Sequence, residues 1–246
     1  MHNKQIEQTL VLIKPDALKN SLTGYVLSQL SEFHMGLIYA GAKVVHVTPM
    51  LAEAHYEEHK GKVFYPSLIE YITGCIHYAD KPHRRRVVAI VYQGSNAVKK
   101  VREVCGPTNP HVAREQKPGC IRSLGTIVAL KDEEGREIGE RMDNLIHASA
   151  TDEEAEREIK LWFKPNEIPP FMHAYSTGRS EELHYFKGGR ILPKYEPGSL
   201  CLVASGDVMW ESDLEALRLI RQGKKAGCSL QTVVAKYLLN DGTGEF

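Results

Sequence analysis

The run Val87 to Tyr92 constrains the fold most, because it holds six consecutive apolar residues. A run of this length without alternation predicts a β-strand that is buried on both faces, and therefore a strand near the centre of a sheet. A sheet of that kind needs a covering layer on each side. The sequence on either side of the run must supply those layers.

The flanking sequence alternates between strand and helix patterns. Pro15 ends an apolar run at 9–13, and further strands are expected at 37–47 and 145–147. Helical periodicity covers 22–33, 51–59, 67–72, 96–104 and 152–163, and in the first of these it places Leu22, Val26, Leu30 and Phe33 on one face. The order predicts an α/β (α+β) fold, a ferredoxin-like βαββαβ antiparallel sheet covered by helices.

Three connecting segments are irregular. Residues 106–119 contain three prolines and are expected to form a long loop, which in a compact domain is more often functional than accidental. Residues 126–129 and 136–140 flank a charged turn and predict a β-hairpin. Residues 75–86 are polar and end in the basic run Arg84–Arg86, which we interpret as a solvated surface; a contact with RNA or a partner is the alternative.

The composition changes after Pro169 and Pro170. The segment that follows is polar and aromatic, with a strand expected at 199–204 and helices at 212–221, capped by Ser212, and 230–239. We therefore expect one domain over residues 1–165 and a small α/β C-terminal extension over residues 166–246. The sequence does not indicate the role of this extension.

Charge and cysteine content exclude several classes of protein. The 31 basic and 31 acidic residues cancel, so no chain-wide field attracts nucleic acid or an anionic membrane. No apolar stretch approaches the length of about 20 residues that a membrane span needs. The five cysteines form no CxxC pair, which favours reduced thiols and a cytoplasmic location. Neither a membrane nor a nucleic acid is an expected partner.

His147 is the strongest candidate for chemistry. It ends a short apolar run, and the sequence Thr151 to Glu154 has the form of a capping box that opens a helix. An imidazole at a strand end can act as a nucleophile, an acid or a base, but it is also a common structural residue. No Walker A pattern and no HExxH zinc pattern occurs in the chain.

Basic residues could supply an anion site beside this histidine. Lys14 follows a strand, while Arg102 and Arg122 flank the proline-rich segment that holds Thr108 and Asn109. If these side chains converge, the resulting pocket suits a polyphosphate, because guanidinium groups match phosphate oxygens. Taken one by one, arginines such as these two are more often solvated or salt-bridged than bound to phosphate. Composition and spacing go no further than a candidate phosphate site.

A set of ordered motifs extends the argument. They are TLVLIKPDA at 9–17, HY at 55–56, FYPSL at 64–68, VKKVR at 98–102, GPTNP at 106–110, KPGCIR at 117–122, NLIHAS at 144–149 and AEREIKLWF at 155–163. Together they make residues from about 7 to 165 resemble the nucleoside diphosphate kinase family. Compared with this family, the chain has insertions at about 75–86 and 124–141.

The resemblance implies a ping-pong transfer of the γ-phosphoryl group from a nucleoside triphosphate to a nucleoside diphosphate, through a phosphohistidine at His147. Glu158, Ser149 and Lys14 would assist catalysis. The residues that would hold the phosphates and the ribose are Lys14, Tyr56, Arg102, Thr108, Arg122 and Asn144, and Phe64 would stack on the base beside Leu68. The resemblance also implies Mg²⁺ on the nucleotide phosphates, with no protein metal site, and a homo-oligomer, either a hexamer or a tetramer.

The chain departs from the family at the nucleophile. The family has His-Gly-Ser-Asp where this chain has His147, Ala148, Ser149 and Ala150. If the backbone there needs a positive φ, Ala148 is strained by about 1 kcal/mol or more. The alternative function is a nucleotide-binding regulatory module that is weakly active or inactive. The insertion at 124–141 is interpreted as a hairpin that leaves the protein edge, with a lid over the nucleotide as the alternative.

Overall fold

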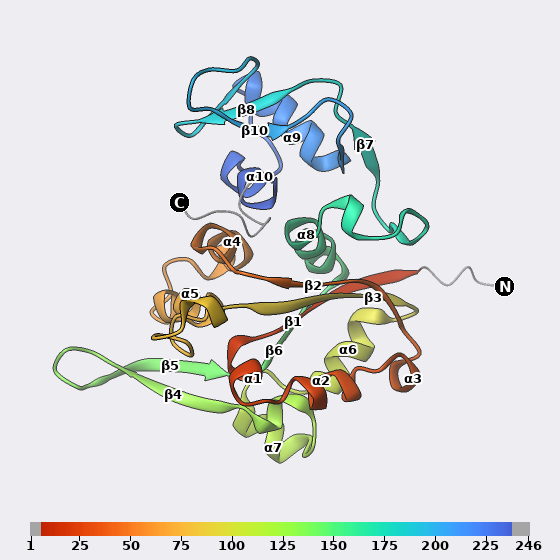
Figure 1. Ribbon diagram of the computed structural model, residues 1–246. Coiled ribbons are helices and arrows are strands. Elements are labelled where there is room, and N and C mark those ends of the chain that lie inside the picture. The colour runs from red at the N-terminus through yellow and green to blue at the C-terminus, as the bar shows by residue number, and fades with distance from the viewer. Residues whose placement is uncertain (1–5, 238–246) are drawn as a thin grey trace.

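A computed structural model describes residues 6–237 of the chain (Figure 1). Its centre is a four-stranded antiparallel sheet with the order β2–β3–β1–β6. The strands are β1 (Glu7–Ile13), β2 (Ile38–Val45), β3 (Val87–Gly94) and β6 (Ile146–Ala148). This is the predicted ferredoxin-like arrangement, and β3 is an inner strand, as its apolar run requires.

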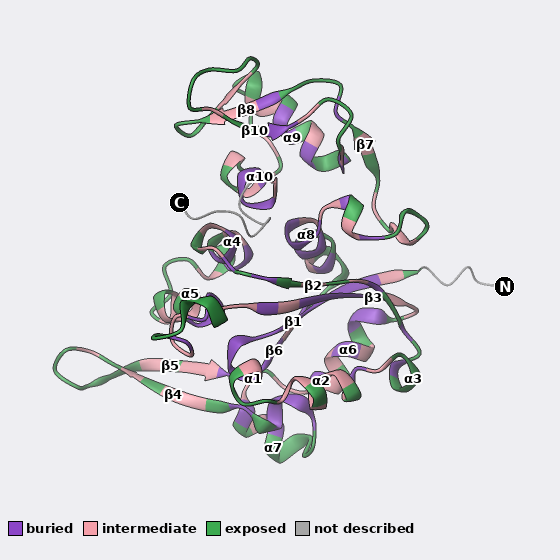
Figure 2. Cartoon of the chain, viewed as in Figure 1, coloured by how far each residue is buried: buried purple, intermediate pink, exposed green. Residues whose placement is uncertain are grey.

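Alternation along β1 explains why both faces of the sheet are covered. Leu10 and Leu12 point to one face, Val11 and Ile13 point to the other, and all four side chains are fully buried. Helices α4 (Pro49–His55), α5 (Tyr65–Ile72) and α8 (Asp152–Trp162) cover the first face. Helices α2 (Thr23–Gln29) and α6 (Ala97–Cys105) cover the second. Figure 2 shows the buried residues concentrated in this layered region.

The helix predicted over 22–33 is wrong in its second half. The short helix α1 (Pro15–Lys19) comes first and α2 follows it. A separate short helix, α3 (Glu32–Met35), comes after α2. Ser31 starts α3 by accepting a hydrogen bond from the backbone N–H of His34. The break rotates Phe33 away from the core, and its side chain is 93% exposed. Val26 and Leu30 are buried as predicted.

The long loop predicted over 106–119 contains a helix, α7 (Pro110–Gln116). The Asn109 side chain accepts hydrogen bonds from the backbone N–H groups of His111 and Val112, and Pro110 occupies the first turn. An asparagine cap followed by proline is a favourable way to begin a helix. The loop prediction is wrong at 110–116, because Pro110 lies in the first turn, where a helix tolerates proline.

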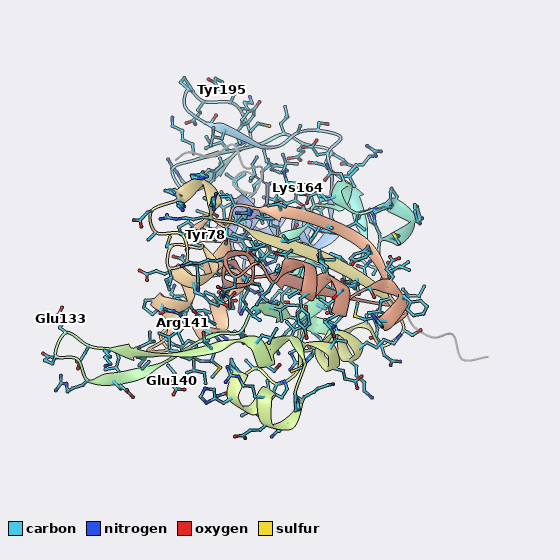
Figure 3. The ribbon with its side chains drawn as sticks, turned by 60° about the horizontal axis from the view of Figure 1, so that its bottom comes forward. Tyr78, Glu133, Glu140, Arg141, Lys164 and Tyr195 are labelled. Carbon is cyan, nitrogen blue, oxygen red and sulfur yellow. The ribbon has the colours of Figure 1, made fainter. Side chains whose placement is uncertain are left out.

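The second insertion is the predicted hairpin. Strands β4 (Thr126–Lys131) and β5 (Glu137–Asp143) form a two-stranded sheet that points away from the central one (Figure 1). Figure 3 places Glu133 at the outer end of this hairpin and Arg141 where it joins the body. The first insertion is irregular apart from a short 3₁₀ turn at Pro82–Arg84. Its Arg84 is exposed, whereas Arg85 is half-buried and bonds to the carbonyls of Tyr78 and Ala79.

The C-terminal extension is richer in strands than predicted. Beside the expected strand β10 (Leu200–Val203), it forms β7 (Thr177–Arg179), β8 (His184–Lys187), β9 (Arg190–Leu192) and β11 (Val208–Trp210). These make one three-stranded and one two-stranded sheet. Helices α9 (Glu211–Arg221) and α10 (Leu230–Tyr237) follow; the residues predicted beyond 237 lie outside the described ones. Ser212 is not a cap, because α9 begins at Glu211 with Trp210 before it.

The extension packs against the outer side of α4 and α8. Helix α10 contacts both of them, and the indole N–H of Trp210 donates to the carbonyl of Phe163 at 2.7 Å. Lys236 and Tyr237 of α10 both bond to the buried carboxylate of Asp213, which ties α10 to α9. The extension thereby supports the helix that carries Glu158. Among residues 6–237, no helix is long and apolar enough to cross a membrane.

Candidate active site

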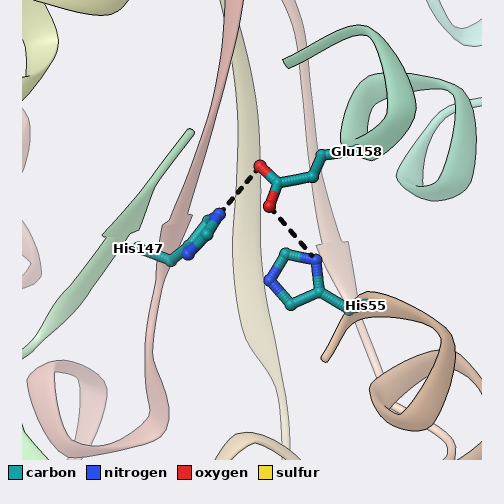
Figure 4. Close-up of side chains that lie close together, drawn as sticks. All are labelled: His55, His147 and Glu158. Atoms are coloured by element: carbon teal, nitrogen blue, oxygen red, sulfur yellow. Dashed lines mark hydrogen bonds and ion pairs between the residues drawn. The ribbon is translucent and has the colours of Figure 1, made fainter. Parts of the chain in front are cut away.

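His147 lies on β6, and its side chain points toward Glu158 on helix α8 (Figure 4). The Nε2 atom of His147 is 2.8 Å from Oε2 of Glu158, and Ser149 Oγ donates to the same oxygen at 2.7 Å. Burial acts to raise the pKa of Glu158, but the charges of the two neighbouring histidines and the hydrogen bonds lower it to about 2. An ionised carboxylate can only accept, so Nε2 of His147 is the donor in this contact, and in the neutral imidazole the lone pair is then on Nδ1.

A second imidazole, His55, stands beside the first. The two rings are 4.5 Å apart at 80°, and His55 Nδ1 lies 3.7 Å from Oε1 of Glu158. The indole N–H of Trp162 also approaches His55 Nδ1 at 3.2 Å. Burial lowers the pKa of His55 well below its usual value. His55 belongs to one of the sequence motifs, but no spacing in the sequence indicates its contact with His147.

His55, His147 and Glu158 place their ligand atoms within 4.8 Å of one another, and among residues 6–237 they are the one such group. Two nitrogens and one carboxylate do not suit Mg²⁺, which prefers oxygen ligands and keeps much of its water.

Lys14 and Asn144 form the next part of the site. Lys14 leaves the end of β1, and its Nζ donates to Oδ1 of Asn144 at 2.8 Å. The Asn144 amide N–H₂ in turn donates to the carbonyl of Thr108 at 2.9 Å, although the Thr108 side chain is exposed. Burial is the main cause that lowers the pKa of Lys14, to about 8. Three of the six residues expected to hold the phosphates and the ribose, Lys14, Thr108 and Asn144, therefore lie together, and Thr108 makes its contact through its backbone carbonyl.

Arg122 and Tyr56 add buried donors. Arg122 is 4% exposed, and it bonds to the carbonyls of Gly106 and Ile146. Its Nε and the Tyr56 hydroxyl have no hydrogen-bond partner among the described residues. Buried donors of this kind are costly unless something pairs with them, so an anionic ligand would stabilise both. Arg102 is half-buried and lines a cavity of about 780 Å³ together with Pro107 and Ala150.

The predicted base-binding residues lie on a different element. Phe64 and Leu68 stand at the start of α5 and are only half-buried. The Phe64 ring is 5.7 Å from the ring of His59, which stacks on Tyr56 at 6.0 Å. Leu68 packs against the core. These contacts are between rings and apolar groups, in contrast to the hydrogen-bonded residues around His147.

The strain considered at Ala148 is absent. Ala148 lies in β6 and is not among the described non-glycine residues with a positive φ, which are Ser21, Asn96 and Leu145. Leu145 has φ 70°, and two hydrogen bonds hold it there: its N–H donates to Asp16 and its carbonyl accepts from the backbone of Lys14. The positive φ is therefore two residues before His147, at Leu145, rather than one residue after it, at Ala148.

The helix that follows begins as predicted. Thr151 accepts a hydrogen bond from the backbone N–H of Glu154. The Glu154 carboxylate reaches Ala150 N–H rather than that of Thr151, so the reciprocal half of the capping box is displaced by one residue. Ala150 itself is exposed.

Known proteins match most of the chain. Residues 7–168 match the family described as "Nucleoside diphosphate kinase". A protein of that name from Pyrococcus furiosus is 41% identical over 170 residues, which is 69% of this chain and 91% of the relative. One from Staphylococcus aureus is 41% identical over 167 residues, covering 68% and 93%.

Solved structures agree. The nucleoside diphosphate kinase of Aquifex aeolicus is 30% identical, with a TM-score of 0.53, covering 67% of this chain and 99% of its own. A Borrelia burgdorferi nucleoside-diphosphate kinase, titled a transition state mimic with bound vanadate and ADP, is 31% identical, with a TM-score of 0.51. It covers 67% of this chain and 91% of its own. Residues after 168 lie outside the family match.

Proposed function

The chain belongs to the nucleoside diphosphate kinase family, and we propose that its phosphoryl transfer runs through Nδ1 of His147. The enzyme acts on nucleoside di- and triphosphates. The observation that carries the proposal is the 2.8 Å contact between His147 Nε2 and Glu158, because it leaves the other ring nitrogen as the nucleophile.

The transfer has two balanced halves. The Nδ1 lone pair attacks the γ-phosphorus, the bond to the bridging oxygen breaks, and the nucleoside diphosphate leaves with that electron pair. The Nε2 proton stays in its hydrogen bond, where the Glu158 carboxylate offsets the positive charge that develops on the ring. A terminal oxygen of a second nucleoside diphosphate then attacks the phosphorus, the P–N bond breaks, and its electron pair returns to Nδ1 as the triphosphate leaves.

The phosphates would lie among the buried donors. Lys14, Arg122 and Tyr56 present an ammonium, a guanidinium and a hydroxyl, and Asn144 fixes the first of these. Arg102 adds a second guanidinium, and its charge acts on Arg122. Phosphoryl transfer depends on such positioning and charge rather than on covalent chemistry by the protein. The divalent cation that the reaction generally needs would be Mg²⁺, bound to the nucleotide oxygens.

The base would stack on Phe64, with Leu68 beside it. Every base offers a π-face, so a site that relies on stacking accepts purines and pyrimidines alike. The proposal therefore includes broad base tolerance.

Three further properties belong to the proposal. The edge strand β2 exposes Ile38, Tyr39 and Val44, and an edge of this kind supports a homo-oligomer, which we propose to be a hexamer or a tetramer. The cytoplasmic location continues to rest on the cysteine content, and the division at residue 165 rests on the change in composition. Light scattering coupled to gel filtration measures the oligomer directly.

Labelling tests the nucleophile. Incubation with γ-³²P-ATP and Mg²⁺ should give acid-labile, alkali-stable label on the wild type, which a nucleoside diphosphate removes as labelled triphosphate. His147→Ala should take up none. Label that survives in this variant would reassign the nucleophile. A wild type that binds ATP but takes up no label would favour the inactive nucleotide-binding module instead.

A further inference from the structure

Side chains from both insertions bind one carboxylate, that of Asp143. This residue closes β5 directly before Asn144, and its side chain is 8% exposed. Arg141, from the hairpin, donates Nε–H to Oδ1 at 2.6 Å and Nη2–H to Oδ2 at 3.1 Å. His77, from the first insertion, donates Nε2–H to Oδ2 at 3.1 Å. Segments far apart in the sequence thus meet next to a phosphate-site residue.

The same cluster reaches helix α5, which carries Phe64 and Leu68. Arg141 Nη1 donates to Ser67 Oγ at 3.2 Å. The buried ring of Tyr71, also on α5, lies 5.3 Å from the His77 ring and 6.0 Å from the Arg141 guanidinium. On the same ring, Lys14 Nζ lies 5.1 Å from the centroid. One aromatic ring therefore contacts both inserted residues and the lysine of the phosphate site.

The charges of the cluster are matched. Burial acts to raise the pKa of Asp143, but hydrogen bonds and charge from His77 and Arg141 outweigh it and bring the pKa below its usual value. A buried carboxylate with charge-assisted partners holds its geometry strongly, because removal of one partner leaves an uncompensated charge. An isolated two-stranded hairpin is marginal on its own, so these bonds also fix where β5 ends.

We propose that His77 and Arg141 are positioning residues for phosphoryl transfer: by holding Asp143 they fix Asn144 and Lys14 at the phosphate end of the nucleotide site and α5 at its base end. The two insertions then act as one brace across the site. The proposal rests on the proposed function, since it takes Lys14 and Asn144 as phosphate ligands. Within the β4–β5 hairpin, the residues next to Asp143 would then affect kcat, whereas the residues at the turn would not.

Asp143→Asn tests the brace, with Asp132→Asn as a matched control. Asp132 is also a hairpin carboxylate bonded to an arginine, Arg136, but it lies at the turn. Asp143→Asn should lower kcat about tenfold or more, because misplaced phosphate ligands cost most in the transition state, and the release of α5 should raise nucleotide KM as well. Asp132→Asn should leave both constants within a factor of about two, as surface substitutions away from special features usually do.

A pH profile gives a readout that a purely structural role would not move. Burial lowers the pKa of Lys14 most, and the charge of Arg122 lowers it further. The charges of Asp16, Asp143 and Cys105 act to raise it. Without the Asp143 charge Lys14 loses its proton at lower pH. The alkaline limb of kcat/KM should therefore move to lower pH in Asp143→Asn and stay in place in Asp132→Asn.

Two outcomes overturn the proposal: a kcat for Asp143→Asn within about twofold of wild type, or an equal loss in both aspartate variants. If Asp143→Asn does not fold, His77→Gln decides instead, with a several-fold loss of kcat in support and an unchanged kcat against. Failure of the proposed function looks different, because wild type itself would then take up no label on His147.

Discussion

The two ends of the proposed nucleotide site are held by different kinds of contact. At the phosphate end, Lys14, Arg122 and Asn144 are buried and bonded to each other or to backbone carbonyls. At the base end, Phe64 and Leu68 are half-buried and meet their neighbours through rings and apolar groups. Hydrogen bonds are directional, whereas apolar contacts are not. The site should therefore be exacting about phosphate geometry and tolerant of the base.

The largest effect that this comparison predicts belongs to Glu158→Gln. The amide keeps a hydrogen-bond acceptor near His147 but removes the charge that offsets the imidazolium. By analogy with a catalytic dyad that loses its carboxylate, kcat should fall by about 10³-fold or more. Single-turnover labelling measures this step without product release. A fall of less than tenfold would mean that the phosphate end does not depend on this pair.

Asn144→Ala should have the next largest effect. It removes the partner of Lys14 and the bond to the Thr108 carbonyl. The loss of one preorganised electrostatic contact should lower kcat about 100-fold. Steady-state kinetics with ATP as donor measure it. An effect confined to KM would place Asn144 at the base end instead.

The pH dependence of wild type should show the same lysine. Lys14 is protonated below its pKa of about 8 and neutral above it. Its attraction for the phosphates is therefore present at neutral pH and is lost as pH rises through 8. We expect kcat/KM to fall in that window, and the limb should vanish in Lys14→Met if residual activity permits its measurement. Glu158, with a pKa of about 2, should contribute no acidic limb above pH 4.

Phe64→Ala tests the base end of the proposed site. Loss of a base–aromatic stack costs about 1–3 kcal/mol, so KM should rise roughly tenfold with kcat nearly unchanged. The rise should be similar for purine and pyrimidine nucleotides. A rise for one base alone would show that the base end reads more than a π-face.

The smallest kinetic effect is expected in the extension. Trp210→Phe leaves the buried carbonyl of Phe163 without its donor, which should cost about 1–2 kcal/mol of unfolding free energy. Both kinetic constants should stay at wild-type values, because the contact lies behind α8. Chemical denaturation measures the stability. A fall in kcat in a fully folded variant would show that the extension also affects the residues at the phosphate end.

Much of the fold was predictable because it depends on local periodicity. The apolar run Val87 to Tyr92 predicts the inner strand β3, and the periodicity over 152–163 predicts the helix α8, which buries Ala155, Ile159 and Trp162. The failures have local causes. A hydroxyl at Ser31 starts a new helix and expels Phe33, and Asn109 turns a proline-rich segment into α7. Very short strands such as β7 and β9 depend on pairing with distant partners, which periodicity does not record.

The site was predictable only in part. Motif resemblance named His147, Glu158, Lys14 and Asn144, and the structure brings these together in the pairs His147–Glu158 and Lys14–Asn144. Their roles stay predictions until the variants are measured. Resemblance could not supply His77 and Arg141, because they lie in segments that the family lacks. Long-range contacts between two insertions leave no spacing signal in one sequence.

Leu145 carries a consequence for how this protein can change. Its side chain fills the core, which favours leucine, while its backbone has a positive φ, which favours glycine. A glycine there would relieve the backbone by about 1 kcal/mol and at the same time empty a cavity that costs about 2–5 kcal/mol. Packing at Leu145 therefore outweighs the backbone strain. A larger neighbour could fill the space that a glycine leaves, but beside Leu145 it would overpack the core, so each of the two substitutions is destabilising without the other.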